Sequence, residues 1–192
     1  MQMTAFSLFF GIFCCVAPSQ KDSTVAVAEP PSLITWTECS NTIQQHPCDI
    51  EAINQLGSTE NLYDYVGRPI VLDLSATWCG PCRAAALEVQ ATQDKYSDID
   101  LAYITILIEN NYGQPPNIGD LEAWANSYGI TTAPILAGSR DLLNPDPKLG
   151  WELHGWPTFY FIDSEMVLRG YLRGFSTAAV EQGIDQIKGE SQ

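Results

Sequence analysis

The chain has 192 residues, of which 23 are Asp or Glu and nine are Lys or Arg, so its formal net charge at pH 7 is −14. Nine scattered cations cannot assemble the basic surface that binds nucleic-acid phosphates, and this excludes nucleic acid as a partner. Hydrophobic residues make up 45% of the sequence and charged residues 17%, which predicts one globular domain with a substantial core rather than a disordered chain.

The first segment has the composition of a secretory signal. Residues 4–17 form an apolar run, and no charged side chain precedes Lys21. The run is too short to cross a bilayer and has the length of the apolar region of a signal peptide. We therefore predict a signal peptide over residues 1–17 and export to the bacterial periplasm or the outer face of a membrane. Two alternatives remain open: a membrane tether through a lipid on Cys14 or Cys15, and a buried N-terminal element.

The next segment is predicted to be a flexible linker. Residues 18–35 are rich in Pro, Ser and small side chains, and the folded domain is therefore expected over residues 36–190. Once the signal is removed, an even number of cysteines remains, which suits an oxidising compartment. These four are Cys39, Cys48, Cys79 and Cys82.

Two buried strands with a helix between them are predicted in the first half of the domain. Residues 70–74 are short, β-branched and almost entirely apolar, apart from Asp73. Residues 81–96 open with Pro81 and continue with good helix formers, and residues 101–108 form a second apolar run. A strand, a helix and a strand in this order predict a right-handed parallel unit.

The second half predicts further helices and strands. In chain order we expect a loop (110–119), a helix (120–128), a short strand (134–137), a loop (138–150), two strands (158–162 and 167–172) and a closing helix (178–187). The spacing of the last two strands is that of an antiparallel hairpin. A βαβ unit followed by a ββα unit predicts an α/β fold with a central mixed sheet flanked by helices.

The sequence Trp78-Cys79-Gly80-Pro81-Cys82 lies where a buried strand gives way to a helix. Cys79 would then sit at the helix N-terminus, where free backbone N–H groups and the helix dipole favour a thiolate. The two residues between the cysteines let the second sulfur reach the first, so the pair can alternate between dithiol and disulfide. Half of a zinc site or a static bridge would use the same spacing, but the flanking strand and helix favour redox chemistry.

This motif resembles the active-site signature of the thioredoxin superfamily, and the resemblance covers residues 62–187. It implies a thioredoxin fold with Cys79 and Cys82 as the redox-active pair. Asp73 precedes Cys79 by six residues, which is the position of the buried acid that transfers protons to and from the buried thiol in thioredoxins. The resemblance therefore implies a catalytic role for Asp73, although a purely structural hydrogen-bonding role stays open.

A second point of resemblance is Trp156-Pro157-Thr158, which introduces the final hairpin as the cis-proline loop does in this superfamily. An ordinary trans proline at Pro157, or a cis bond at Pro134 instead, is the alternative. The extra helical segment between the two halves and the run from Pro157 to Asp163 resemble the exported TlpA-like branch. The implied substrate-binding residues are Trp78, Gly80, Pro81, Trp156 and Pro157.

Two features depart from the family pattern. Trp156 is larger than the Ile, Val or Thr that often precedes the cis-proline, and its bulk would cover part of the substrate groove. Thioredoxins also carry a lysine on the strand after the CxxC helix, whereas this chain has no Lys between Lys95 and Lys148. Something other than a lysine must therefore set the pKa of Asp73.

Cys39 and Cys48 form a separate pair ahead of the core. We expect a structural disulfide that holds the N-terminal extension on the domain. The alternatives are electron exchange with Cys79 and Cys82, or a zinc site that joins all four thiols, for which the spacing is poor. His46 and His154 have no ligand-like spacing and are expected to be ordinary polar residues, so no metal site is predicted.

Together these features predict an exported, TlpA-like thiol-disulfide oxidoreductase that needs no cofactor. Its expected partners are a disulfide-containing protein substrate and an unidentified electron donor, and the Gly-Pro dipeptide between the cysteines favours reduction. One alternative is a peroxiredoxin-like thiol peroxidase with an antioxidant role, although Leu72 and Ala76 stand where that enzyme needs Pro and Thr or Ser. The other is a metal-carrying thioredoxin-like module.

Overall fold

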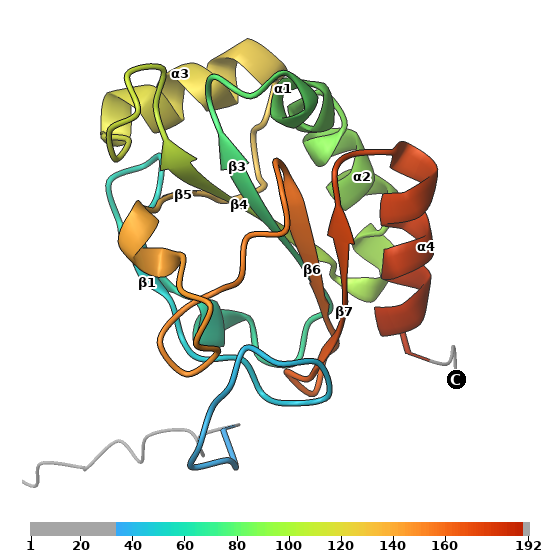
Figure 1. Cartoon of the computed structure of the whole chain (residues 1–192). Helices are drawn as coiled ribbons and strands as arrows, with labels where there is room; N and C mark the ends of the chain where they lie inside the picture. The colour runs from blue at the N-terminus through green and yellow to red at the C-terminus, as the bar shows by residue number, and fades with distance from the viewer. Residues whose placement is uncertain (1–33, 190–192) are drawn as a thin grey trace, which may run out of the picture. The chain divides into compact units, whose positions relative to one another are not determined.

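The computed structural model describes residues 34–189, which contain a five-stranded mixed sheet (Figure 1). The predicted signal peptide, and the predicted linker up to residue 33, lie outside the described residues. The strand order is β5-β4-β3-β6-β7, in which β3, β4 and β5 run parallel while β6 and β7 are antiparallel to their neighbours. The bounds are β3 (Ile70–Ala76), β4 (Ala102–Glu109), β5 (Ile135–Ala137), β6 (Thr158–Ile162) and β7 (Leu168–Arg173). The expected mixed sheet is confirmed.

The helix predicted over residues 81–96 is wrong as a single element. It is divided into α1 (Gly80–Ala86) and α2 (Val89–Lys95), because the N–H of Glu88 bonds to the carbonyl of Ala85 and tightens the turn between them. Neither Leu87 nor Glu88 is a helix breaker, and the apolar spacing runs without interruption across the junction. Sequence periodicity therefore carried no signal of this division.

The other two α-helices lie close to where they were expected. Helix α3 (Ile118–Tyr128) begins earlier than predicted because Asn117 and Asp120 form a capping box at its start. It ends at Gly129, whose φ of 66° lies in the left-handed region that glycine adopts without steric cost. Helix α4 (Thr177–Ile187) closes the domain and buries Val180, Ile184 and Ile187.

Each face of the sheet buries its own cluster of apolar side chains. All four α-helices contribute to one cluster, which includes Cys82 on α1, Trp124 on α3 and Ile184 on α4. The other face is covered by the N-terminal extension and by the long segment between β5 and β6, which brings in Trp151. The α-helices thus pack on one side of the sheet only. Successive residues along a strand point alternately to the helices and to the irregular segments on the opposite face.

The N-terminal extension contains structure that was not predicted. A small hairpin pairs β1 (Glu51–Ile53) with β2 (Thr59–Asn61), and a 3-10 turn, η1 (Leu62–Tyr65), leads into β3. Two further 3-10 turns are η2 (Ser97–Ile99) and η3 (Arg140–Leu142). The strands β1 and β2 have 3 residues each, all exposed or half-buried, so neither is long enough to show the apolar alternation by which strands are found in a sequence. Within residues 34–189, no helix is both long and apolar enough to span a bilayer.

Candidate redox site

The CxxC motif occupies the turn between β3 and α1. Cys79 has an extended backbone and is the N-cap of α1, and its Sγ accepts a hydrogen bond of 3.1 Å from the N–H of Cys82. The structure contains the Cys79–Cys82 disulfide. An N–H donor aimed at Sγ at the start of a helix stabilises negative charge on that sulfur once the disulfide is reduced.

The two cysteines differ in their access to solvent. Cys79 is 3% exposed and Cys82 is fully buried, while Gly80 and Pro81 between them are exposed. An approaching sulfur can therefore reach Cys79 but not Cys82. A side chain at position 80 would meet no atom within 4 Å, so the fold does not require Gly80 and its smallness leaves room outside the helix.

Asp73 lies on β3 under the helical layer. The residue is 1% exposed, and its Oδ1 accepts a 2.7 Å hydrogen bond from the hydroxyl of Ser75. Burial raises the pKa of Asp73 to about 7, although the bond from Ser75 acts in the opposite direction. Its cross-strand partner Phe159 belongs to the same cluster as Cys82, so the acid and the buried sulfur share one layer of the core.

The Trp156–Pro157 peptide bond is cis, and no other cis bond occurs among residues 34–189, including the one before Pro134. Pro157 is buried, and its carbonyl accepts a 2.8 Å hydrogen bond from the N–H of Gly174. On the other side of the bond, the hydroxyl of Thr158 donates to the carbonyl of Gly155 at 2.7 Å. The loop before β6 is thus held at both ends by the protein's own groups.

Two tryptophans from distant parts of the sequence meet beside the motif. The rings of Trp78 and Trp156 pack edge to face, with centroids 5.5 Å apart. Trp78 remains 40% exposed, so this pair forms part of the molecular surface next to Cys79. The bulk of Trp156 is therefore packed against the motif rather than extended into solvent.

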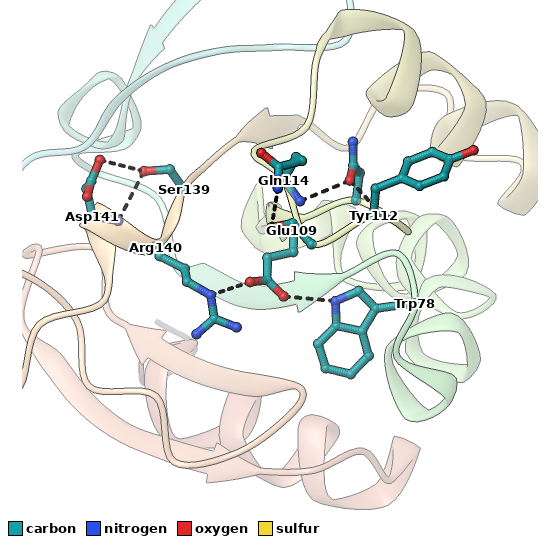
Figure 2. A network of polar contacts seen from close by, with 9 residues as sticks. Trp78, Glu109, Tyr112, Gln114, Ser139, Arg140 and Asp141 are labelled. Carbon is teal, nitrogen blue, oxygen red and sulfur yellow. Dashed lines mark hydrogen bonds and ion pairs between the residues drawn. The ribbon is translucent and has the colours of Figure 1, made fainter.

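Sequence analysis missed the group that holds Trp78. Figure 2 shows Glu109, at the end of β4, between Trp78 and Arg140. The Glu109 carboxylate accepts a 3.0 Å bond from the indole N–H of Trp78 and a second bond from Nε of Arg140. These bonds, led by that from Arg140, hold the pKa of Glu109 below its ordinary value although the residue is buried. A charged residue that ends an apolar strand was the only sequence signal for this role.

The second cysteine pair lies at the other end of the sheet. Cys39 and Cys48 form a disulfide in the N-terminal extension, whose Gln44 N–H bonds to the carbonyl of Leu168 at the start of β7. In Figure 1 this blue segment and α1 lie at opposite ends of the sheet. The zinc site that would join all four thiols is wrong, because the cysteines form two separate disulfides and no three possible metal ligands are grouped within residues 34–189. Electron exchange between the two pairs stays an alternative to the structural role of Cys39–Cys48.

The histidines do not form a metal site with other residues. Nδ1 of His46 contacts the carbonyl of Met166 and its ring stacks on Trp36, while the ring of His154 stacks on Tyr171. In the part of the chain that the structure describes, no three His, Cys, Asp or Glu residues are grouped to hold a metal ion.

Comparison with known proteins places this geometry in a family. The sequence matches the AhpC/TSA family over residues 43–171, which is most of the described domain. The chain belongs to the AhpC/TSA family. It is thioredoxin-like, and its family comprises thiol-disulfide oxidoreductases, so the fold and the general class of redox chemistry agree with the sequence-based prediction.

Individual relatives have thioredoxin-related names. The chain is 29% identical to thioredoxin-like protein YneN of Bacillus subtilis, over 74% of this chain and 78% of the relative. The fold is similar to that of a thioredoxin-family thiol:disulfide interchange protein from Chlorobium tepidum, with a TM-score of 0.60, 16% identity, and coverage of 81% of this chain and 100% of the other. It is also similar to the exposed lipoprotein thioredoxin Etrx1 of Streptococcus pneumoniae, with a TM-score of 0.52, 26% identity, and coverage of 72% and 98%.

Proposed function

We propose that this protein is an exported thiol-disulfide reductase that reduces the disulfides of other exported proteins through Cys79 and Cys82. The observation that carries the proposal is the asymmetry of the pair at the start of α1. Cys79 receives an N–H hydrogen bond and has the access to solvent, whereas Cys82 is buried in the same layer as an acid whose pKa is raised. That asymmetry assigns different tasks to the two sulfurs.

The reaction starts from the dithiol form. The Cys79 thiolate attacks one sulfur of the substrate disulfide, forming a mixed disulfide and releasing the other substrate sulfur as a thiolate. Cys82 then loses its proton to Asp73 and attacks the Cys79 sulfur. This step breaks the mixed disulfide and releases the second substrate sulfur, leaving the Cys79–Cys82 disulfide. The substrate gains two electrons, and its two thiolates take up one proton from Asp73 and one from solvent. A dithiol donor must then return two electrons and two protons to the protein.

Asp73 suits the task of accepting the proton from Cys82. A carboxylate with an ordinary pKa is too weak a base to take a proton from a thiol. Burial raises the pKa of Asp73 to about 7, so its carboxylate is a stronger base near neutral pH. Trp78, Gly80 and Pro81 are exposed on either side of Cys79, and Trp156, which precedes Pro157, packs against Trp78. We assign the binding of the substrate chain to these five residues. Their aromatic and backbone surfaces suit an extended polypeptide, which supports a protein rather than a small molecule as substrate.

The proposal of export rests on residues 1–17 and on the even set of cysteines in the domain. One structural relative, Etrx1, is named an exposed lipoprotein thioredoxin, which supports the same location for this chain. Expression of the full chain in bacteria, followed by fractionation and mass spectrometry, tests this part. We expect the mature protein outside the cytoplasm without residues 1–17, and recovery of the intact chain from the cytoplasm would contradict export.

The direction of electron flow is tested by the reduction potential. Equilibration in glutathione buffers of known ratio, with the Cys79–Cys82 dithiol followed by alkylation, should give a value near that of thioredoxin, about −270 mV. A value near −120 mV would make the protein an oxidant and overturn the reductase assignment. Reduction of insulin with dithiothreitol as donor provides the matching activity assay.

Two competing functions have their own readouts. A thiol peroxidase consumes hydrogen peroxide in the presence of a dithiol, and a metal carrier retains stoichiometric copper or zinc on the reduced protein. We expect insulin reduction without peroxide turnover or bound metal. Bound metal together with failure to reduce insulin would contradict the proposal, and so would peroxide turnover faster than insulin reduction.

A further inference from the structure

Three polar side chains lie together on the buried face of the sheet beneath the redox site. Asp73 and Ser75 are two residues apart on β3, so both point to the same face, and Thr105 on β4 is the register partner of Asp73. All three are at most 1% exposed. Neighbouring strands lie about 4.8 Å apart, so the short side chains of Asp73 and Thr105 stand beside one another.

The hydrogen bonds of this group are only half made. Oδ1 of Asp73 accepts from Ser75, but Oδ2 of Asp73 and the hydroxyl of Thr105 are both buried without a hydrogen-bond partner. Buried polar groups without partners are costly and are rare in folded proteins. Because Asp73 and Thr105 are register partners on adjacent strands, their two unpaired groups are placed to satisfy each other's hydrogen bonding.

We propose that Thr105 is a positioning residue for Asp73. Its hydroxyl is linked to Oδ2 of Asp73 through one bridging water and adapts to the protonation state of the carboxyl. The inference rests on the proposed function for its consequence in catalysis, but the contact itself does not. A hydroxyl is both donor and acceptor, so it can donate to the ionised carboxylate and accept from the protonated acid. A group at position 105 that could only donate, or only accept, would suit just one protonation state of Asp73.

The contrast with a lysine gives this contact its chemical meaning. An ammonium group next to Asp73 would favour only the ionised carboxylate and lower its pKa. Between Lys95 and Lys148 the chain has no lysine, and the register partner of Asp73 is a neutral threonine. With a hydroxyl there, burial dominates, and the pKa of Asp73 stays at about 7. The acid can then both take and return a proton near neutral pH.

Few other titratable groups face Asp73. Tyr103, on the same face of β4, interacts with Asp73, but burial raises the pKa of its phenol, so it stays neutral throughout the relevant range. The helix above supplies Cys82, which does not titrate while it is in the disulfide. From β6 the facing partner is the apolar Phe159. The titration of Asp73 in the oxidised protein therefore reports on Ser75 and Thr105.

The test is carbon NMR of the oxidised protein, which follows the Asp73 carboxyl directly and needs no turnover. In wild type we expect a midpoint near pH 7, with the Cβ shift of Thr105 following the same midpoint. Thr105→Val, which keeps the shape and removes the hydroxyl, should raise the midpoint by about one pH unit. A hydroxyl bonds the charged carboxylate more strongly than the neutral acid, so the ionised form of Asp73 loses more when the hydroxyl is removed. Thr105→Ser should restore it, and Thr92→Val, a buried threonine on α2, should leave it unchanged.

Several results would overturn the assignment. These are an unchanged midpoint in Thr105→Val, failure of Thr105→Ser to restore it, or an equal shift in Thr92→Val. If Thr105→Val does not fold, the wild-type Cβ shift decides, because independence of Thr105 from the Asp73 titration would also contradict the contact.

The pH profile of insulin reduction links the contact to the proposed function. The acid limb of kcat/KM should move to higher pH in Thr105→Val by the same amount as the NMR midpoint, and it should return in Thr105→Ser. An acid limb that stays in place while the NMR midpoint moves would overturn the catalytic consequence. Failure of wild type to reduce insulin at any pH would instead contradict the reductase function, and the NMR result would stand by itself.

Discussion

The domain carries two disulfides at opposite ends of one sheet, and their surroundings differ in kind. Beside Cys39–Cys48, the side chain of Asn41 binds backbone groups: it accepts from the N–H of Cys48 and donates to the carbonyl of Gly150, both at 2.8 Å. Around Cys79–Cys82 the neighbours are a helix start, a buried acid and exposed aromatic rings. The same covalent bond thus lies among backbone hydrogen bonds at one end of the sheet, and at a helix start above a buried acid at the other.

This difference shows what a disulfide needs in order to be reactive. Sequence separation alone distinguishes the pairs only weakly, since both close short loops. What distinguishes them is whether a donor can stabilise a thiolate on one sulfur and whether a base can reach the other. In the proposed function the pair at α1 has both, since Sγ of Cys79 accepts from the N–H of Cys82 and Asp73 acts as the base. This leads to predictions that separate the two ends by experiment.

The largest expected effect is on turnover. Cys79→Ser should lower insulin reduction to the rate of dithiothreitol alone, because no thiolate remains to attack the substrate. The double variant Cys39→Ser and Cys48→Ser should keep activity close to wild type at a temperature where it is folded. Turnover by Cys79→Ser, or loss of turnover in the folded double variant, would contradict the division of roles.

Asp73→Asn should lower activity and alter the pH dependence of stability. Since the pKa of Asp73 is raised from 3.8 to about 7, wild type should lose stability as pH rises between these values, by up to about 4 kcal/mol. Below this window the carboxyl is protonated in both states and the loss disappears. The neutral variant lacks the penalty, so it should be the more stable protein at pH 8.

Urea unfolding at pH 5 and pH 8 measures this change, and insulin reduction should fall by about 100-fold in the same variant. Asp98→Asn, which changes an exposed carboxylate, is the matched control and should match wild type in both assays. A parallel pH dependence in wild type and Asp73→Asn would show that Asp73 is ionised in the fold throughout.

The Cys39–Cys48 disulfide, at the other end of the sheet, should contribute to the stability of the fold. Loss of the Cys39–Cys48 bond should lower the free energy of unfolding by about 2–3 kcal/mol, the entropy of closing a loop of this length. Urea denaturation of the double variant, compared with oxidised wild type, measures it. An unchanged midpoint would mean that the hydrogen bonds of Asn41 hold the extension without the disulfide.

The smallest effect is expected at the aromatic rim, by which we mean the packed rings of Trp78 and Trp156 beside Cys79. Glu109→Gln removes the charge that binds Arg140 and weakens the bond from Trp78, so kcat/KM for insulin should fall about 3- to 10-fold. At the opposite end, Asn41→Ala should cost stability, by about 1–2 kcal/mol, and leave kcat/KM unchanged. An equal fall of kcat/KM in Glu109→Gln and Asn41→Ala would contradict the distinction between the redox end and the structural end of the sheet.

The sequence predicted the parts of the fold that depend on local patterns. Short apolar runs gave the strands of the sheet, and the CxxC motif between a strand and a helix gave the redox pair. The division between α1 and α2 was missed because a single tightened hydrogen bond causes it, and no residue type marks such a bond. The hairpin of β1 and β2 was missed because strands of 3 residues show no periodicity and their order depends on packing against the domain.

The candidate site was only partly predictable for a similar reason. Asp73 could be identified by its distance from Cys79, and Pro157 by its place directly before the first strand of the final hairpin. Glu109, Arg140 and Thr105 lie far from the motif in sequence and reach it only through strand pairing and the segment after β5. Without knowledge of the strand register, no sequence spacing connects Thr105 with Asp73.

Asn41 couples regions that are separate in the sequence. Its backbone N–H bonds to the carbonyl of Pro147, and its side chain bonds to Gly150 and Cys48. From Gly150 the chain continues without a helix or strand to Pro157 beside the redox site. Local opening of the extension should therefore loosen residues 147–157 as well, and their amide hydrogens should exchange with solvent together. The far end of the sheet would then set how firmly the loop that we propose to bind the substrate is held.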